Sequence, residues 1–440
     1  MDIFSYFLQN YQLYHELDQI SIGYGPCDKS QIRIVKSAGD DFWNHKFDVN
    51  PQKVIWKKWN DVDIPFLFEQ DDISEITTCK NDCTLINYDI VASAFYFLSG
   101  WNEFVNSSDE YGRFKYGESM VKKIGITHVP VVNYYFDILH DAISQHTGKT
   151  SDKGLWNDYS FAVALTHDID NCMSAWLEGS FSELKKGNLL SIPSLVLKRF
   201  MSRDDWFNFD LISSLEKQYG ARSTFFFLPE KGKKDKMKNA DYHINNQKIR
   251  EVIRKLEDDG FEIGIHGSFG THVDTQKLKN EITKINSPAI TGNRFHFLMF
   301  DTVKTTGILE KCGIRYDTSL GFAEHTGFRR GICRPFYLYD FERNKISNVL
   351  EIPLIVMDTT LRNQKYMGYS PEKTRDEIFK LLAEVKKFKG VFTLLWHNTY
   401  FSEYKFTGWK QIYIDVLEHC INNNALMTTC RNVYERITGK

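Results

Sequence analysis

Short apolar runs that end abruptly in ionisable residues are the clearest pattern in this chain. The first run, residues 161–165, leads directly into residues 166–170 (THDID). A continuous apolar run of this length predicts a strand buried on both faces, as in a parallel sheet or an α/β barrel. Asp168 and Asp170 would point to the same side of this strand, because strand side chains alternate. Capping of a following helix would explain both carboxylates without a site, but the recurrence of similar strand ends downstream favours a site.

Beyond residue 170 the hydrophobic pattern alternates between strand and helix periodicity. Further strands are predicted at 223–229, 261–266, 294–298, 314–317, 350–356 and 391–397, and helices separate most of them, at 206–218, 247–259, 275–285, 303–312, 371–388 and 409–422. Strands that alternate with helices of this length indicate βα units and a parallel sheet. Because there are about seven strands, each close to an ionisable residue, we predict an incomplete, seven-stranded (β/α) barrel.

The first part of the chain predicts a smaller α/β domain. Apolar residues have helical spacing in 3–17, 87–104 and 130–143, and short strands are predicted at 32–35, 54–56 and 64–68. No metal-ligand spacing, phosphate loop or nucleophile motif occurs there, so its role stays undefined, structural or substrate-orienting. A polar stretch, 145–158, is the predicted linker. A chain of 440 residues is too long for one ordinary core, and we predict domains at 1–155 and 156–440.

Composition excludes several classes of protein. The net charge of −2 argues against a nucleic-acid-binding protein, which would carry a basic excess. The eight cysteines, from Cys27 to Cys430, form no CxxC pair and are expected to be free thiols. The N-terminus lacks the basic and apolar segments of a secretory signal, and no apolar run is long enough to span a bilayer. The expected location is therefore the cytoplasm.

The ionisable residues at the predicted strand ends suggest one shared site. They are Asp168, Asp170, His266, His296, Asp317 and His397. The carboxyl ends of parallel strands meet at one rim, so we expect these residues to converge. Imidazole together with carboxylate suits a divalent transition metal, commonly Zn²⁺, which lowers the pKa of bound water. A second carboxylate could accept the water's proton, and a histidine opposite could protonate a leaving group.

Several short motifs, in a fixed order, carry a family resemblance. They are 165–170 (LTHDID), 262–268 (EIGIHGS), 294–298 (RFHFL), 315–322 (RYDTSLGF), 333–336 (CRPF), 351–354 (EIPL) and 394–398 (LLWHN). In these motifs the chain resembles the polysaccharide deacetylase superfamily, of the NodB-homology, carbohydrate esterase family 4 type. It resembles most a two-domain bacterial branch, in which an N-terminal domain of undefined role precedes a divergent deacetylase domain. The stretches 87–93 (NYDIVAS) and 109–114 (DEYGRF) are similar to that branch as well.

The resemblance implies a role for each matching residue. Asp168 corresponds to the general base, and Asp170 and His266 correspond to metal ligands. Arg294 matches the arginine that steadies the base carboxylate, and His397 matches the general acid. Asp317 falls where the family has a residue that orients that acid. Substrate contacts are expected within the same motifs, at His167, Ser268, Tyr316, Arg334 and Trp396.

The sequence departs from the family at the second metal histidine. That residue normally follows the first by four positions, where both imidazoles reach one ion. Here the position is occupied by Gly270. His272 could replace it if the loop bulges, His296 could reach across from the next strand, or the second imidazole could be missing.

The resemblance implies a metal-dependent hydrolase that removes an acetyl group from an N-acetylated sugar, in surface-polysaccharide or glycan metabolism. The expected cofactor is a divalent metal, Zn²⁺ in the first place. A carbohydrate substrate made inside the cell would be linked to a nucleotide or a lipid. Two alternatives stay open at this point: an O-acetyl esterase acting on carbohydrate, and a catalytically inactive glycan-binding protein that keeps the barrel.

Overall fold

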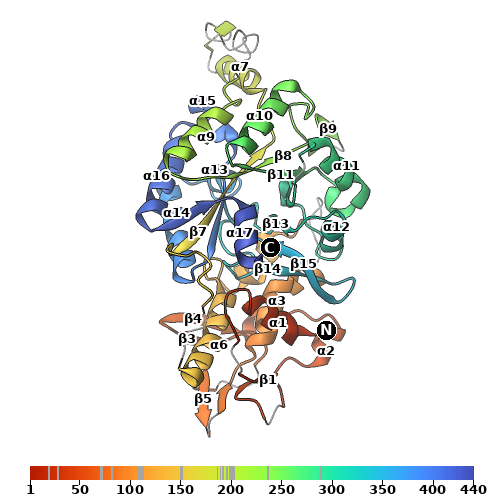
Figure 1. Cartoon of the computed structure of the whole chain (residues 1–440), viewed down its shortest axis with the longest axis vertical. Coiled ribbons are helices and arrows are strands. Elements are labelled where there is room, and N and C mark those ends of the chain that lie inside the picture. Colours follow the sequence, from red (N-terminus) through yellow and green to blue (C-terminus); the bar gives the residue numbers. More distant parts are fainter. Residues whose placement is uncertain are drawn as a thin grey trace.

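A computed structural model of the chain describes residues 1–17, 20–26, 29–69, 73–80, 83–106, 113–148, 152–185, 187–188, 190, 193–194, 197, 204–234, 237–287 and 290–440. Cys27 and residues 109–112, named above, lie outside these ranges. The N-terminal part, red to orange in Figure 1, lies at one end of the molecule, and the larger part, yellow to blue, lies at the other. Among the described helices, none is both long enough and apolar enough to cross a bilayer.

The N-terminal part combines helices with a small mixed sheet. The sheet has the strand order β1-β2-β6-β5, in which only β5 runs antiparallel, and a separate hairpin pairs β3 with β4. Helix α3 is buried along its whole length because its sequence is apolar on all sides; Asp89 caps its start and Gly100 ends it in the left-handed region. The strands are β1 Ile22–Tyr24, β2 Ile32–Ile34, β3 Ile55–Trp59, β4 Val62–Phe66, β5 Thr77–Lys80 and β6 Cys83–Ile86, and the α-helices are α1 Ile3–Tyr11, α2 Asp40–Asn44, α3 Ile90–Ser99, α4 Trp101–Val105, α5 Met120–Lys123 and α6 Val131–Thr147.

The larger part is built on one curled sheet of ten strands. Its order is β14-β15-β13-β12-β11-β8-β7-β17-β16, with β18 beside the first half of β7, and only β14 is antiparallel to its neighbour. The central strand β7 is buried at every position, as its apolar run predicts. The strands are β7 Phe161–Ile169, β8 Thr224–Phe227, β11 Glu262–Gly267, β12 Gly292–Phe295, β13 Tyr316–Asp317, β14 Phe336–Asp340, β15 Lys345–Glu351, β16 Leu354–Met357, β17 Val391–Leu395 and β18 Ala425–Thr428; β9 Lys233–Lys234 and β10 Met237–Lys238 form a separate small hairpin.

The predicted strand at 350–356 is divided in two, and this division shapes the barrel. Pro353, which has no N–H for a ladder, separates β15 from β16. The two halves pair with opposite ends of the sheet, β15 with β13 and β16 with β17. Because only two residues join them, the sheet must curl until its ends are close, without a ladder that closes it. The prediction of an incomplete barrel of parallel strands is confirmed, but the sheet has ten strands and not seven. The predicted strand at 350–356 forms two strands, and β14 and β18 were not predicted.

Helices lie around the sheet and connect most of its consecutive strands, but among the described residues none lies between β13 and β16 (Figure 1). They are α7 Ala175–Lys185, α9 Phe209–Gln218, α10 Gln247–Asp258, α11 Thr275–Ile285, α12 Thr305–Lys311, α13 Asp358–Arg362, α14 Pro371–Lys387, α15 Glu403–Phe406, α16 Trp409–Asn422 and α17 Cys430–Thr438. The cysteines that the structure describes are all free thiols, as expected.

The two parts of the molecule share a hydrophobic core. One continuous cluster of buried side chains extends from Ile3 in α1 to Met427 in β18. Polar contacts reinforce it: the buried carboxylate of Glu103 pairs with Arg329 at 2.8 Å and with Arg330 at 3.1 Å. The boundary predicted at residue 155 stays a prediction, because the packed core continues across it.

Candidate metal centre and active-site cleft

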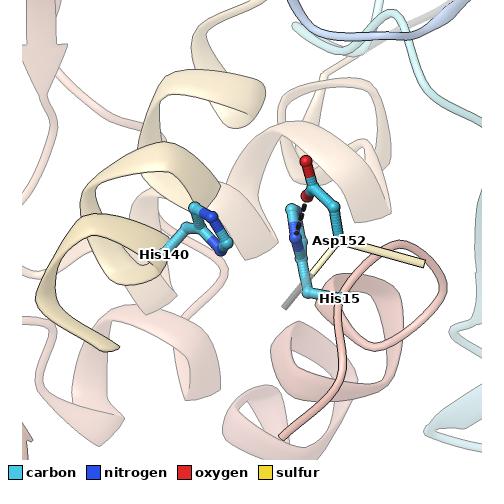
Figure 2. A group of neighbouring side chains, drawn as sticks. All are labelled: His15, His140 and Asp152. Carbon is cyan, nitrogen blue, oxygen red and sulfur yellow. Dashed lines mark ion pairs between the residues drawn. The ribbon is translucent and has the colours of Figure 1, made fainter. Parts of the chain in front are cut away.

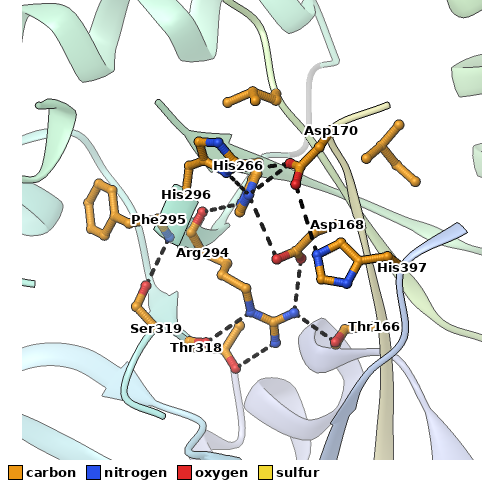
Figure 3. Close-up of polar contacts among 12 residues, drawn as sticks. Thr166, Asp168, Asp170, His266, Arg294, Phe295, His296, Thr318, Ser319 and His397 are labelled. Atoms are coloured by element: carbon orange, nitrogen blue, oxygen red, sulfur yellow. Dashed lines mark hydrogen bonds and ion pairs between the residues drawn. The ribbon is translucent and has the colours of Figure 1, made fainter. Parts of the chain in front are cut away.

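Three ligand-type side chains meet at the carboxyl ends of the central strands (Figure 3). Asp170 follows β7, His266 lies near the end of β11, and His296 follows β12. Asp170 Oδ1 lies 3.3 Å from His266 Nε2 and 3.5 Å from His296 Nδ1, and these two nitrogens are 3.1 Å apart. We call Asp170, His266 and His296 the rim group.

The hydrogen bonds of the rim group turn its lone pairs inward. His266 Nδ1 lies 2.8 Å from the carbonyl oxygen of Arg294, and His296 Nε2 lies 2.9 Å from that of Lys238. A carbonyl only accepts, so in the neutral rings these outer nitrogens carry the protons. The two inner nitrogens and Asp170 Oδ1 are then three acceptors that face one another. Asp170 Oδ1 is buried and has no hydrogen-bond donor within the described residues.

This donor set fits a divalent metal ion. Ligands at about 2.0–2.1 Å from a tetrahedral zinc ion lie roughly 3.3 Å from one another, which matches the three separations of the rim group. Burial lowers the pKa of His296, which favours the neutral ring that a metal needs. Burial alone would raise the pKa of Asp170, but the positive charge of protonated His296, His266 and His397 holds it well below its usual range. Burial would likewise lower the pKa of His266, but Asp168 and Asp170 raise it. The group thus attracts positive charge, which protons supply without a metal and a bound cation would supply in their place.

The backbone directly after His296 forms a strained turn. Phe297 and Leu298 both have positive φ, at 60° and 55°, in the left-handed region that non-glycine residues rarely adopt. Such conformations cost of the order of 1 kcal/mol each and persist where the surroundings over-determine them. The turn they produce follows directly after the imidazole that completes the rim group.

Asp168 lies beside the rim group and is held by Arg294. Its Oδ1 accepts from Arg294 Nη1 at 3.0 Å, while Oδ2 lies 3.7 Å from His266 Nε2. The guanidinium is fully buried and also donates to Thr166 Oγ1 and to the carbonyl and hydroxyl of Thr318. Four acceptors therefore fix the arginine, and the arginine fixes one oxygen of Asp168, leaving the other toward the rim group (Figure 3).

His397 lies opposite, after the last residue of β17. Its Nε2 is 3.9 Å from Asp170 Oδ2, and its Nδ1 donates to Asp358 Oδ1 at 2.8 Å. Burial would lower the pKa of His397, but the carboxylate of Asp358, helped by Asp170 and Asp168, raises it to about 9. The ring is thus held as an imidazolium at neutral pH.

Asp358 is a residue that the sequence analysis did not assign to the site. It follows directly after β16, which pairs in parallel with β17, so the carboxylate lies beside His397. The rule applied to the other strands, an ionisable residue at a strand end, would have found it. Asp317, which the resemblance places in this role, instead lies buried with Asn293 and Ser319 as its hydrogen-bond donors.

A cleft of about 700 Å³ opens beside the rim group and includes Asp170 and His397 in its lining. Its walls are rich in aromatic rings, those of Trp206, Tyr369, Tyr400, Phe406 and Trp409. The sequence did not identify these residues, because they come from loops and helices that only the fold brings together. The high aromatic content of the sequence, 15%, is compatible with a sugar-binding cleft but does not indicate which aromatic residues line it.

The residues predicted to contact substrate lie elsewhere. His167, Ser268, Tyr316, Arg334 and Trp396 are all buried, and none lines the cleft. His167, for example, is fully buried between the carbonyl of Trp396 and the carboxylate of Glu216. It points to the other side of β7 from Asp168, as strand alternation requires. Their place outside the cleft gives a substrate role no support, and that role stays a prediction.

His272 also lies outside the rim group. It belongs to a short 3-10 helix, Thr271–Val273, that begins after Gly270 at φ 88°. Its buried ring lies near Phe269 and Phe295, and burial lowers its pKa to about 4. Of the two histidines left open by the sequence, His296 is the one that faces His266 and Asp170.

A second set of two histidines and one aspartate lies where the N-terminal part meets the barrel part (Figure 2). We call His15, His140 and Asp152 the junction group. His15 Nδ1 lies 2.9 Å from Asp152 Oδ1, and its ring centroid is 4.6 Å from that of His140. Two cations adjoin the group: Arg334 Nη1 donates to His15 Nε2 at 2.9 Å, and Lys389 Nζ lies 2.8 Å from Asp152 Oδ2.

Comparisons with known proteins give one family match and several structural similarities. A family of unknown function (DUF7033) matches residues 3–148. No curated protein matches the sequence. Similar solved structures include a protein named as a polysaccharide deacetylase from Mycobacterium smegmatis, with 15% identity over 64% of this chain and 92% of that chain (TM-score 0.43).

Two further structures show a comparable likeness. One is named as a polysaccharide deacetylase from Pseudomonas aeruginosa PAO1, with 13% identity, 64% of this chain and 92% of that chain covered, and a TM-score of 0.42. The other is PuuE allantoinase, with 14% identity, the same coverage and a TM-score of 0.41. All three identities are low, so the assignment of function depends on the residues of the site itself.

Proposed function

We propose that this protein is a metal-dependent hydrolase that removes an acetyl group from an N-acetylated sugar. One observation carries the proposal: the rim group presents three inward-facing acceptor atoms with no donor between them, and a carboxylate and an imidazolium lie on either side. The motifs that resemble polysaccharide deacetylases supply the same residues, with Asp168 as base and His397 as acid.

The donor set of Asp170, His266 and His296 suits Zn²⁺, with a fourth position open. When bound, such an ion would supply Lewis-acid polarisation of the acetyl oxygen and a more acidic water molecule. Asp168 Oδ2 would then accept the water's proton, while Arg294 keeps the other oxygen, Oδ1, in place. His397, charged through its contact with Asp358, would donate a proton from Nε2 to the departing amine.

The aromatic cleft supports a carbohydrate as the substrate. Sugar rings present apolar C–H faces that stack on aromatic side chains, and Trp206, Tyr400 and Trp409 line the space next to His397. We propose that the sugar binds in this cleft, because the cleft reaches His397 and none of the five residues expected from the sequence lines it. Trp206, Tyr400 and Trp409 are themselves largely buried, so only the edges of these rings would meet the sugar. The substrate would be an N-acetylated sugar carried on a nucleotide or a lipid.

Replacement of the base tests the proposal. Asp168→Asn should lower turnover of an N-acetylated amino sugar roughly a thousandfold, with the metal content per chain unchanged. Glu178→Gln is the matched control, because Glu178 lines the same cleft but pairs with Lys405 outside the reacting groups. Separate measurement of released acetate and of free amine distinguishes N-deacetylation from ester hydrolysis. Full activity of Asp168→Asn would refute the proposal.

A further inference from the structure

Helix α7 presents its large apolar side chains to solvent. Leu177, Phe181 and Leu184 are 42%, 58% and 53% exposed, and their spacing of four and three residues puts them on one face. The opposite face carries the small residues Ala175 and Gly179, which are buried. This polarity is the reverse of an ordinary surface helix, which turns its apolar side inward.

The same character continues after the helix. Leu190 and Leu197 are described residues that are 94% and 57% exposed. Single exposed apolar residues are common on soluble proteins, but five large ones within a short segment are not. The sequence of 185–203 contains five lysine or arginine residues and no aspartate or glutamate, whereas α7 itself carries Glu178 and Glu183 and the stretch is followed by Asp204 and Asp205. Exposed apolar side chains combined with basic charge are typical of segments that lie on anionic bilayers.

The exposed face adjoins the candidate active site. Glu178, on α7, lines the cleft that contains His397 and forms an ion pair with Lys405 of α15. Figure 1 shows α7 at the top of the barrel part, beyond α15 and far from the N-terminal part. A surface that covers Leu177, Phe181 and Leu184 would therefore lie next to the mouth of the cleft.

We propose that the apolar face of α7, together with Leu190 and Leu197, docks on an anionic lipid bilayer and that the deacetylase substrate is a lipid-linked sugar presented there. The proposal of a lipid-linked sugar as the substrate rests on the function proposed above. A projecting apolar face suits the soft interface of a bilayer, whereas a folded protein partner needs a groove of matching shape, and the basic residues complement anionic head groups. Docking would hold the cleft close to the head-group layer, where the sugar of a lipid-linked substrate lies.

Flotation with lipid vesicles tests the docking. The full-length protein should float with phosphatidylcholine vesicles that contain about a quarter phosphatidylglycerol. The triple variant Leu177→Ser, Phe181→Ser, Leu184→Ser should bind at least tenfold more weakly. The matched control replaces three exposed apolar residues elsewhere, Leu211, Val273 and Ile421, by serine and should float like the unchanged protein. Far-UV circular dichroism verifies that both variants are folded.

Each other outcome of the flotation experiment overturns the docking proposal. Failure of the unchanged protein to float, or equal binding by both triple variants, would do so. A separate measurement of oligomeric state, by size-exclusion chromatography, covers one more case. If the α7 variant loses self-association but still binds vesicles, this face is a contact between copies of the chain, and the docking proposal is wrong.

Activity measurements separate this inference from the proposed function. The α7 variant should deacetylate a water-soluble acetamido sugar at the normal rate, but an N-acetylated glycolipid in the same vesicles at least tenfold more slowly. Equal rates on the glycolipid would overturn the lipid-linked substrate. If the unchanged protein hydrolyses neither substrate, the proposed function is wrong, and so is the proposal of a lipid-linked substrate. The flotation result still decides whether α7 docks on a bilayer.

Discussion

The rim group and the junction group contain the same residue types, two histidines and one aspartate, yet they differ in where their protons lie and in the cations beside them. In the rim group the outer nitrogens face carbonyl oxygens, so the inner acceptors confront one another. In the junction group Arg334 donates to His15 Nε2, which leaves the ring's proton on the nitrogen that faces Asp152. Lys389 occupies the other carboxylate oxygen. Proximity of ligand residues is thus insufficient; the orientation of their hydrogen bonds decides whether a cation is needed.

The largest effect that tests this comparison is expected from His296→Ala. Loss of an outer hydrogen-bond partner alone weakens metal sites by about 10–100-fold, so removal of a ligand should weaken metal binding more than that, and activity should fall with it. Elemental analysis of the purified protein after dialysis measures the metal, and deacetylation measures the activity. His140→Ala and His272→Ala are the controls, and both should retain one ion per chain. Metal loss in His140→Ala instead would reverse the roles of the two groups.

A smaller loss is expected from Asp358→Asn, which leaves the rim group intact. The carboxylate holds the pKa of His397 at about 9, so the imidazolium persists at neutral pH. Without that charge the folded pKa falls, and the acid form is lost at lower pH. Turnover should drop about a hundredfold at neutral pH, and the alkaline limb of the kcat profile should move to lower pH. Unchanged metal content with an unchanged alkaline limb would exclude Asp358 as the partner of the acid.

Much of the rim could be predicted from local sequence, because strand periodicity is a local property. Asp168, Asp170, His266 and His397 were found from apolar runs that end in ionisable residues, and the structure brings all four to one edge of the sheet. The choice of His296 could not be made in this way. It depends on a turn with two positive φ angles after β12, and the residues at these positions, Phe297 and Leu298, do not predict such a turn.

Hydrophobic periodicity could not predict the cleft or the position of Asp358 beside His397. The predicted strand at 350–356 was correct in its apolar character, but its division at Pro353 is what turns Asp358 toward His397. Likewise, Arg334 stands in a motif of the family, yet in this fold it lies at the junction, stacked on Tyr14 at 4.6 Å. A residue's place in a family motif therefore did not predict whether its side chain reaches the candidate active site.

The junction group should reveal itself through stability rather than metal binding. Burial, reinforced by Arg334, lowers the pKa of His15 to about 4, from an ordinary value of about 6.5. Between these values the unfolded chain binds a proton that the folded chain does not, so stability falls as pH falls. At about pH 5 the loss amounts to about 2 kcal/mol relative to neutral pH. Urea denaturation at both pH values measures it, and His15→Gln, which cannot titrate, should lack this component. A His15→Gln difference equal to that of the unchanged protein would contradict a neutral, buried His15.

The smallest effect is expected from Lys389→Met, which removes one of the two cations at the junction group. The lysine side chain is 62% exposed, so its pair with Asp152 should contribute less than about 1 kcal/mol to the free energy of unfolding. Arg334 stays in place, and it still keeps the proton of His15 between that ring and Asp152. Added zinc should therefore bind at one ion per chain in this variant, as in the unchanged protein. A second tightly bound ion in Lys389→Met would mean that competition from a neighbouring cation, and not the orientation of hydrogen bonds, separates the two groups.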